Sequence, residues 1–311
     1  MTELLIIGGS RFLGRAVAES FRSYGGFRVT VMNRGTRPPV PGVDESIVCD
    51  KNDRAAFSEV LRARYWDVVV DTMLQPEELE FVIQSAGDRI GHFIHVGSIG
   101  VYGDARLLPA PEWLPMAVTD NVESVIFTDK LQQDQTLMRA FMEKRFPVSI
   151  LRMSMIYGRG AVPLDGVGDR MPEYFQALAA GKAVELAGDG TALLQPGHVR
   201  DLARAFPLCA VRSETIGQIY NICGSHAMML RDYVRQCAAA LNAPQPRFVL
   251  RSVPELRERC PERSLTGIRF VTQHMCAAID KARRDLDWRP EIPLHAGLAD
   301  NFAWMRENGK L

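Results

Sequence analysis

A glycine-rich turn close to the start of the chain most constrains its fold. The run Leu4–Gly8 is continuously apolar, as expected for a strand buried on both faces of a sheet. It leads through GGSRFLG into a segment that carries Leu13, Val17 and Phe21 at helical spacing. A buried strand, a glycine turn and an amphipathic helix in this order predict the opening of a parallel α/β sheet.

The following segments repeat this alternation of strand and helix. Further strands are predicted at Arg28–Met32, Ser46–Asp50, Asp67–Thr72, His92–Ser98 and Val148–Ser154, and a long helix over Glu123–Lys144. The fold class is therefore α/β, with a Rossmann-type, doubly wound parallel sheet in residues 1–157 as the dinucleotide-binding domain. Glycine and proline interrupt the pattern after Tyr157, so residues 158–311 are expected to form a smaller C-terminal region that caps the substrate, with about 198–224 returning to the sheet.

The glycine turn itself predicts a binding site for a dinucleotide. Gly8, Gly9 and Gly14 have the spacing of a phosphate-binding loop, and Arg11 stands where the middle glycine is expected. Glycine allows the tight turn and the close approach of a pyrophosphate, while the helix start offers amide donors. The expected contact residues are Gly8, Gly9, Ser10, Arg11, Phe12, Leu13 and Gly14. The alternative is a tight turn without a ligand.

The end of the second strand favours NADP over NAD, although NAD is also allowed. NAD binders usually place an acidic residue there for the ribose hydroxyls, whereas this chain has Asn33 and Arg34. Arg34 can pair with a 2′-phosphate, and Arg11 can add a second cation. The alternative is a solvated Arg34 and a structural ion pair for Arg11. Asp50, after the third strand, is expected either to accept a hydrogen bond from the adenine amino group or to cap the next helix.

The order of five motifs resembles that of the extended short-chain dehydrogenases, the NAD-dependent epimerase/dehydratase family. They are GGSRFLG, VGSIGVYG, the Lys130 helix, LRMSMIYGRG and HVRDLA, so the resemblance covers nearly the whole chain. Four segments look closest to the atypical branch that contains chloroplast stem-loop-binding proteins: GGSRFLG, NRG, TQHMCAAIDKARRDLDWRP and GLADNFAWM.

The resemblance implies a catalytic Ser, Tyr and Lys, and here the tyrosine is missing. Ser98 and Lys130 match the family's serine and lysine, but Ile126 stands four residues before Lys130, where the family has its tyrosine. In the family the lysine binds the nicotinamide ribose and lowers the pKa of that tyrosine. Tyr102 is the best substitute for the acid, although a packing role is the stronger alternative for it. Glu123, Tyr157 and Asp129 are weaker candidates.

Other residues indicate which classes of substrate and partner to expect. Sugar-nucleotide members often carry an arginine shortly before the HVRDLA motif, and TALLQPGHV has none, so a small substrate other than a nucleotide sugar is expected. Arg159 and Arg170 are expected to be solvated loop residues, and His198 to be structural. The Lys130 helix can form a homodimer interface, as it does in the family.

Composition bears on the remaining classes of function. Lys and Arg number 37, as do Asp and Glu, so the net charge is zero and nucleic-acid binding is not expected. None of the six cysteines has C-x-x-C spacing, the histidines lack metal-ligand spacing, and no apolar run is long enough to cross a membrane. We therefore expect a cytoplasmic protein without a metal. Its function is expected to be that of an NAD(P)-dependent oxidoreductase or a redox-neutral epimerase, dehydratase or isomerase; the alternative is a catalytically silent NAD(P)-binding sensor or an RNA-associated scaffold.

Overall fold

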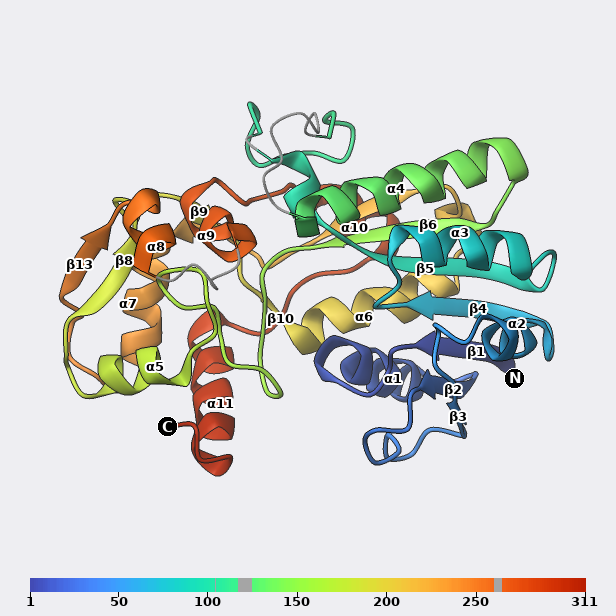
Figure 1. The fold of residues 1–311 in the computed structure, drawn as a ribbon, viewed down its shortest axis with the longest axis horizontal. Helices are drawn as coiled ribbons and strands as arrows, with labels where there is room; N and C mark the ends of the chain where they lie inside the picture. Colours follow the sequence, from blue (N-terminus) through green and yellow to red (C-terminus); the bar gives the residue numbers. More distant parts are fainter. Residues whose placement is uncertain (104, 117–124, 260–264) are drawn as a thin grey trace.

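A seven-stranded parallel sheet forms the centre of the first lobe in the computed structural model, which describes residues 1–103, 105–116, 125–259 and 265–311 (Figure 1). Every neighbouring pair of strands in this sheet runs parallel. In sheet order the strands are β11 (Ile219–Ile222), β6 (Val148–Met153), β5 (Ile90–Ser98), β4 (Trp66–Asp71), β1 (Thr2–Ile7), β2 (Phe27–Asn33) and β3 (Glu45–Val48). The predicted doubly wound fold is thus confirmed.

Helices cover both faces of this sheet because the central strands are apolar on both sides. Leu4 and Ile6 of β1 belong to one core cluster, while Leu5 and Ile7 belong to another. The first cluster includes residues of α1 (Phe12–Tyr24) and α6 (Val199–Ala210), and the second includes residues of α2 (Arg54–Arg62), α3 (Pro76–Ser85) and α4 (Val125–Lys144). Figure 1 shows α3 and α4 on one side of the sheet and α1 and α6 on the other.

Local sequence signals fix the starts of three of these helices. The side chain of Asp53 accepts a hydrogen bond from the amide of Ala56 and so caps α2. Pro76 occupies the first turn of α3, where its missing N–H costs nothing, and the preceding amide of Gln75 donates to Glu78. His198 caps α6 through its side chain.

The second lobe has a core of its own, built from short strands and helices. Two strand pairs, β8 (Val184–Ala187) with β13 (Phe248–Arg251) and β9 (Leu193–Leu194) with β12 (Met228–Met229), lie among its helices. Those helices are α5 (Pro172–Ala179), α7 (Leu230–Ala240), α8 (Val253–Arg259), α9 (Leu265–Thr272) and α11 (Leu294–Glu307). Apolar residues of this lobe form a separate core cluster.

The chain passes more than once between the two lobes. Strands β7 (Ile156–Tyr157) and β10 (Gly197–His198) pair where the lobes meet, and β11 then adds to the edge of the main sheet. Helix α10 (Asp280–Leu286) and Trp288 also join the core of the first lobe, although the sequence places them in the capping region. None of the described helices combines the length and apolarity needed to cross a bilayer.

Candidate functional site

The glycine loop between β1 and α1 has the tight geometry that its sequence predicts. Gly8 has a φ of +91°, which L side chains rarely adopt. A Cβ atom at Gly14 would lie 2.3 Å from the carbonyl oxygen of Gly8, and one at Gly9 would lie 2.9 Å from Cγ1 of Val31. The loop therefore excludes a side chain at Gly14, where backbone is the obstacle, and it brings the start of α1 against the end of β1.

The same loop presents unused hydrogen-bond donors. Arg11 stands at the N-cap of α1 without a side-chain capping bond, and the first turn carries no acidic residue. The hydroxyl oxygen of Ser10 is buried and has no hydrogen-bond partner within the described part of the chain. An anion at this position would satisfy the hydroxyl and the free amides of the helix start. The residues present here consequently fit the pyrophosphate of a dinucleotide.

A cavity of about 100 Å³ lies beside the glycine loop, at the end of β2. The amide of Gly35 donates to Oδ1 of Asn33 at 2.8 Å, which shapes the turn that carries Arg34. The cations that line the cavity are Arg34, Arg37 and Lys51. The sequence predicted Arg34, which is found there, and also Arg11, which is exposed and does not line the cavity. The sequence did not predict Arg37, although the second arginine of NRGTR was a signal for it.

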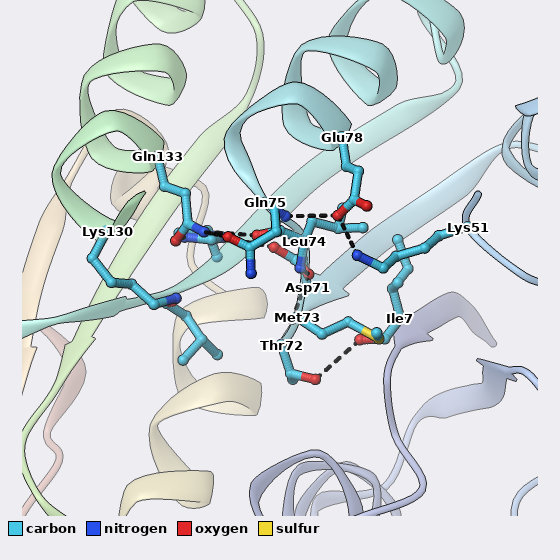
Figure 2. A network of polar contacts seen from close by, with 12 residues as sticks. Ile7, Lys51, Asp71, Thr72, Met73, Leu74, Gln75, Glu78, Lys130 and Gln133 are labelled. Atoms are coloured by element: carbon cyan, nitrogen blue, oxygen red, sulfur yellow. Dashed lines mark hydrogen bonds and ion pairs between the residues drawn. The ribbon is translucent and has the colours of Figure 1, made fainter. Parts of the chain in front are cut away.

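Asp50 forms a local turn rather than a helix cap. Its Oδ1 accepts a hydrogen bond from the amide of Asn52 at 2.9 Å. The cap of α2 comes from Asp53, so the alternative that Asp50 caps this helix is wrong, because the helix begins three residues later than that alternative required. Contact of Asp50 with an adenine stays a prediction. The next residue, Lys51, forms an ion pair with Glu78 of α3 (Figure 2).

Ser98 is the last residue of β5, and the side chain of Lys130 reaches this end of the strand from α4. Oγ of Ser98 accepts a hydrogen bond from the amide of Gly100 at 3.1 Å, so its hydroxyl hydrogen can still be donated. Nζ of Lys130 donates to the carbonyl oxygen of Val96, two residues before Ser98, at 2.8 Å. The lysine therefore points from α4 to the end of the strand that carries Ser98.

Burial lowers the pKa of Lys130, and the negative charges of Asp71, Asp134 and Asp129 offset part of this effect. Ile126 lies one helical turn before Lys130 on α4, the position that the resemblance assigns to the missing tyrosine. Glu123, one of the weaker substitutes, lies outside the described residues. Asp129, another of the weaker substitutes, acts on Lys130 as a neighbouring negative charge on the same helix.

Tyr102 has the contacts of a structural residue. Its hydroxyl donates to Oδ1 of Asn221 at 2.9 Å and accepts from Nη1 of Arg152 at 2.8 Å. Burial raises the pKa of Tyr102, although the charge of Arg152 and both hydrogen bonds oppose the rise. These contacts occupy the hydroxyl and favour packing over the acid role for which Tyr102 was the best candidate.

The other residues singled out in the sequence are also structural. Tyr157 is buried with its ring edge against His198, and burial raises its pKa. Nδ1 of His198 accepts the amide of Arg200 at 3.3 Å, which confirms the capping role, and burial lowers the pKa of this histidine to about 4. Arg170 is not a solvated residue, because its guanidinium donates to the carbonyls of Val162 and Ile156.

Arg159, by contrast, is exposed and pairs with Asp300 and Glu307 at the surface, close to the solvated role that was expected for it. The described residues contain no group of three or more His, Cys, Asp or Glu side chains suited to holding a metal ion.

Comparison with known proteins finds a family match for one segment and more distant relatives along nearly the whole chain. Residues 79–223 match the NAD dependent epimerase/dehydratase family. The chain is 27% identical over 319 residues to the chloroplast stem-loop binding protein of 41 kDa b from Arabidopsis thaliana, covering 96% of this chain and 78% of that protein. It is 20% identical to a dTDP-L-rhamnose 4-epimerase from Burkholderia thailandensis, covering 98% and 95% of the two chains.

Solved structures share the fold over the full chain. A dTDP-glucose 4,6-dehydratase from Bacillus anthracis in complex with NAD superposes with a TM-score of 0.77 at 18% identity, over 100% of this chain and 98% of that one. A UDP-glucose 4-epimerase from Bifidobacterium longum in complex with NAD+ and UDP also gives 0.77 at 18% identity, over 99% of each chain. The matched segment, the similarity along almost the whole chain and the shared fold agree with the resemblance to the NAD-dependent epimerase/dehydratase family that the motifs indicate.

Proposed function

We propose that this chain is an NADP-dependent enzyme that acts on a small organic substrate, as an oxidoreductase or as a redox-neutral epimerase, dehydratase or isomerase. The observation that carries this proposal is the half-buried Lys130, whose ammonium donates to the carbonyl of Val96, two residues before Ser98. Removing an ammonium from water costs free energy, which one hydrogen bond to a backbone carbonyl offsets only in part. A silent scaffold has no need of such an ammonium at the cofactor edge of its sheet.

In the proposed mechanism the residues of this chain bind, orient and polarise. The glycine loop and Ser10 hold the pyrophosphate, and Lys130 binds the hydroxyls of the nicotinamide ribose. A nicotinamide dinucleotide held there would contribute hydride-transfer chemistry. Ser98 donates a hydrogen bond to a substrate oxygen, and the lowered pKa of Lys130 lets it exchange a proton nearer to neutral pH than an ordinary lysine. Because Ile126 carries no proton, the reaction proceeds without the family's tyrosine.

Replacing Lys130 with alanine tests the enzymatic role. Purified protein with NADP or NADPH is offered small ketones, aldehydes and alcohols, and turnover is followed by nicotinamide absorbance and by mass spectrometry of the products. We expect Lys130→Ala to lower kcat/KM about tenfold or more, because it removes a hydrogen bond from a charged group. Lys144→Ala, in the exposed last turn of the same helix, is the matched control and should leave turnover unchanged. Equal turnover by the wild-type and Lys130→Ala proteins contradicts the role.

The preference for NADP is proposed from the cations around the cavity at the end of β2. Arg34 and Arg37 line this cavity, and neither has the acidic neighbour on β2 that would repel a 2′-phosphate. We expect Arg34→Ala to weaken NADP binding about tenfold while changing NAD binding less than about twofold. Isothermal titration of both cofactors measures this.

Arg62→Ala serves as the control for loss of one positive charge. Arg62 is exposed in the last turn of α2, which leads into the amino end of β4. The cavity lies at the other end of the strands, after β2. Both cofactors should bind this variant as they bind the wild type. Equal or tighter binding of NAD than of NADP by the wild type removes the proposed preference.

The proposed substrate is smaller than a nucleotide sugar. Family members that bind such substrates often place an arginine before the α6 motif, and residues 191–197 of this chain contain no cation. The buried side chain of Gln195 is occupied by the carbonyl of Gly224 and the amide of Ala277. This segment thus offers a diphosphate neither a charge nor a free amide side chain.

A second candidate function is RNA binding, favoured by the name of the Arabidopsis relative and by Ile126. The balanced charge of the chain opposes it, because RNA binding is dominated by phosphate contacts from Lys and Arg. A filter-binding series over salt concentration with a stem-loop RNA separates the two. Salt-dependent RNA binding by a protein that binds neither dinucleotide favours the second function.

A further inference from the structure

A chain of buried polar side chains connects β4, β5 and α4 below the candidate site. Asp71, His95 and Gln133 are each at most 1% exposed. Nδ1 of His95 lies 2.7 Å from Oδ2 of Asp71, and Nε2 of His95 lies 3.2 Å from Oε1 of Gln133. Burial alone would raise the pKa of Asp71, but the hydrogen bond and charge of His95 and two backbone amides lower it. His95 is therefore held between a strand end and a helix.

One end of this network fixes the position of α4 against β5. Gln133 contacts His95, and Lys130, three residues earlier on the same helix face, contacts the carbonyl of the next strand residue, Val96. The amide of Gln133 also donates to the carbonyl of Leu74 at 2.8 Å. Figure 2 shows Lys130 and Gln133 extending from α4 toward the turn that follows Asp71. Two adjacent contacts on one strand set the register of the helix that carries Lys130.

The other end of the network reaches the glycine loop. Oδ1 of Asp71 accepts the amides of Met73 and Leu74, each at 2.8 Å, and so shapes the turn after β4. In this turn the hydroxyl of Thr72 lies 3.1 Å from the carbonyl oxygen of Ile7 (Figure 2). It also lies 3.3 Å from the carbonyl oxygen of Gly8. Polar contacts thus run from the glycine loop through Asp71 and His95 to the helix of Lys130.

We propose that His95 is a positioning residue for Lys130, which holds the ammonium in place for the nicotinamide ribose of a dinucleotide gripped at the glycine loop. The inference rests on the proposed function for the identity of the ligand. Replacing a whole buried polar group by apolar residues of similar volume is often neutral or stabilising, so stability alone does not explain the set of Asp71, His95 and Gln133. A fully connected buried network holds its residues in one geometry, and this would fix the position of the Lys130 ammonium.

Two ligands separate positioning from general damage. NADP spans both halves of the site, whereas adenosine 2′,5′-bisphosphate carries only the adenosine half with its phosphates. We expect His95→Leu to weaken NADP binding about tenfold and bisphosphate binding less than about twofold in isothermal titration. Lys130→Met should show the same selectivity, and the double variant should bind NADP no more weakly than Lys130→Met, because the two residues act through one contact. His95→Asn, which keeps a donor toward Asp71, should restore part of the affinity.

A second pair of variants serves if His95→Leu fails to fold. Gln133→Met removes the α4 end of the network but leaves the Asp71–His95 pair, and it should also weaken NADP selectively. Gln132→Met, at the exposed neighbouring position of the same helix, is the matched control and should bind both ligands normally.

Four outcomes overturn the inference. Equal loss of both ligands in the folded variants shows general damage rather than positioning. Weakening by Lys130→Met without weakening by the His95 or Gln133 variants leaves the proposed function standing and removes the role of His95, as does full additivity in the double variant. Wild-type protein that binds neither NADP nor NAD refutes the proposed function, and the inference with it.

Discussion

Replacing Arg152 with alanine is expected to lower the free energy of unfolding by about 3–5 kcal/mol. Arg152 is 2% exposed, and its Nε donates to Oδ2 of the fully buried Asp134 at 2.8 Å. The other carboxylate oxygen of Asp134 is buried without a hydrogen-bond partner among the described residues. Removal of the guanidinium would leave this carboxylate without its hydrogen-bond donor, with only the charge of Lys130 to offset its burial. The hydroxyl of Tyr102 would also lose its donor.

Urea denaturation of the single and double variants separates charge burial from packing. Arg139→Ala, an exposed site on α4, should change the free energy of unfolding by less than about 0.5 kcal/mol. A double variant, Arg152→Met with Asp134→Leu, should recover much of the loss, because it leaves no unpaired buried charge. If Arg152→Ala were as stable as the wild type, or if the double variant were as unstable as the single one, this account of the pair would be wrong.

The features that the sequence predicted are those that local chemistry decides. The strand at Leu4–Gly8 could be recognised because a strand covered on both faces must be apolar without interruption. The close packing of Gly14 on Gly8 follows from the spacing of the loop alone. The return of residues near His198 to the sheet is visible as one more helix and strand in the pattern, and β11 does lie in the main sheet.

The features that escaped prediction depend on residues far apart in the chain. Tyr102 contacts Asn221 and Arg152, which lie 119 and 50 residues away, so its occupied hydroxyl has no local signal. His95 meets Gln133 across 38 residues. Arg170 lies in a glycine-rich stretch that looks solvated, yet its guanidinium donates to the backbone carbonyls of Ile156 and Val162. The choice between a catalytic and a packing role therefore needed three-dimensional contacts.

Gly14→Ala is expected to weaken dinucleotide binding about 100-fold, because moving the start of α1 weakens amide hydrogen bonds to a charged pyrophosphate, each worth about 1.5–3 kcal/mol. The added Cβ would lie 2.3 Å from the carbonyl oxygen of Gly8, whereas carbon and oxygen atoms in contact normally stay about 3.3 Å apart. The obstacle is backbone rather than a flexible side chain, so α1 must move away from β1. Crowding of this kind also costs about 1–3 kcal/mol of stability. Titration with NADP and NAD, together with urea denaturation, measures both effects.

Ser20→Ala, further along α1, tests whether any small change to this helix has the same effect, and it should bind both dinucleotides normally. Gly9→Ala gives an intermediate case, because its Cβ would meet only side-chain atoms of Val31 and Ile6, which can shift. The expected order of affinity is therefore wild type, Gly9→Ala and then Gly14→Ala. A Gly14→Ala protein that folds and binds a dinucleotide as tightly as the wild type would show that the ligand does not depend on the start of α1. The binding site would then have to lie elsewhere on the sheet edge.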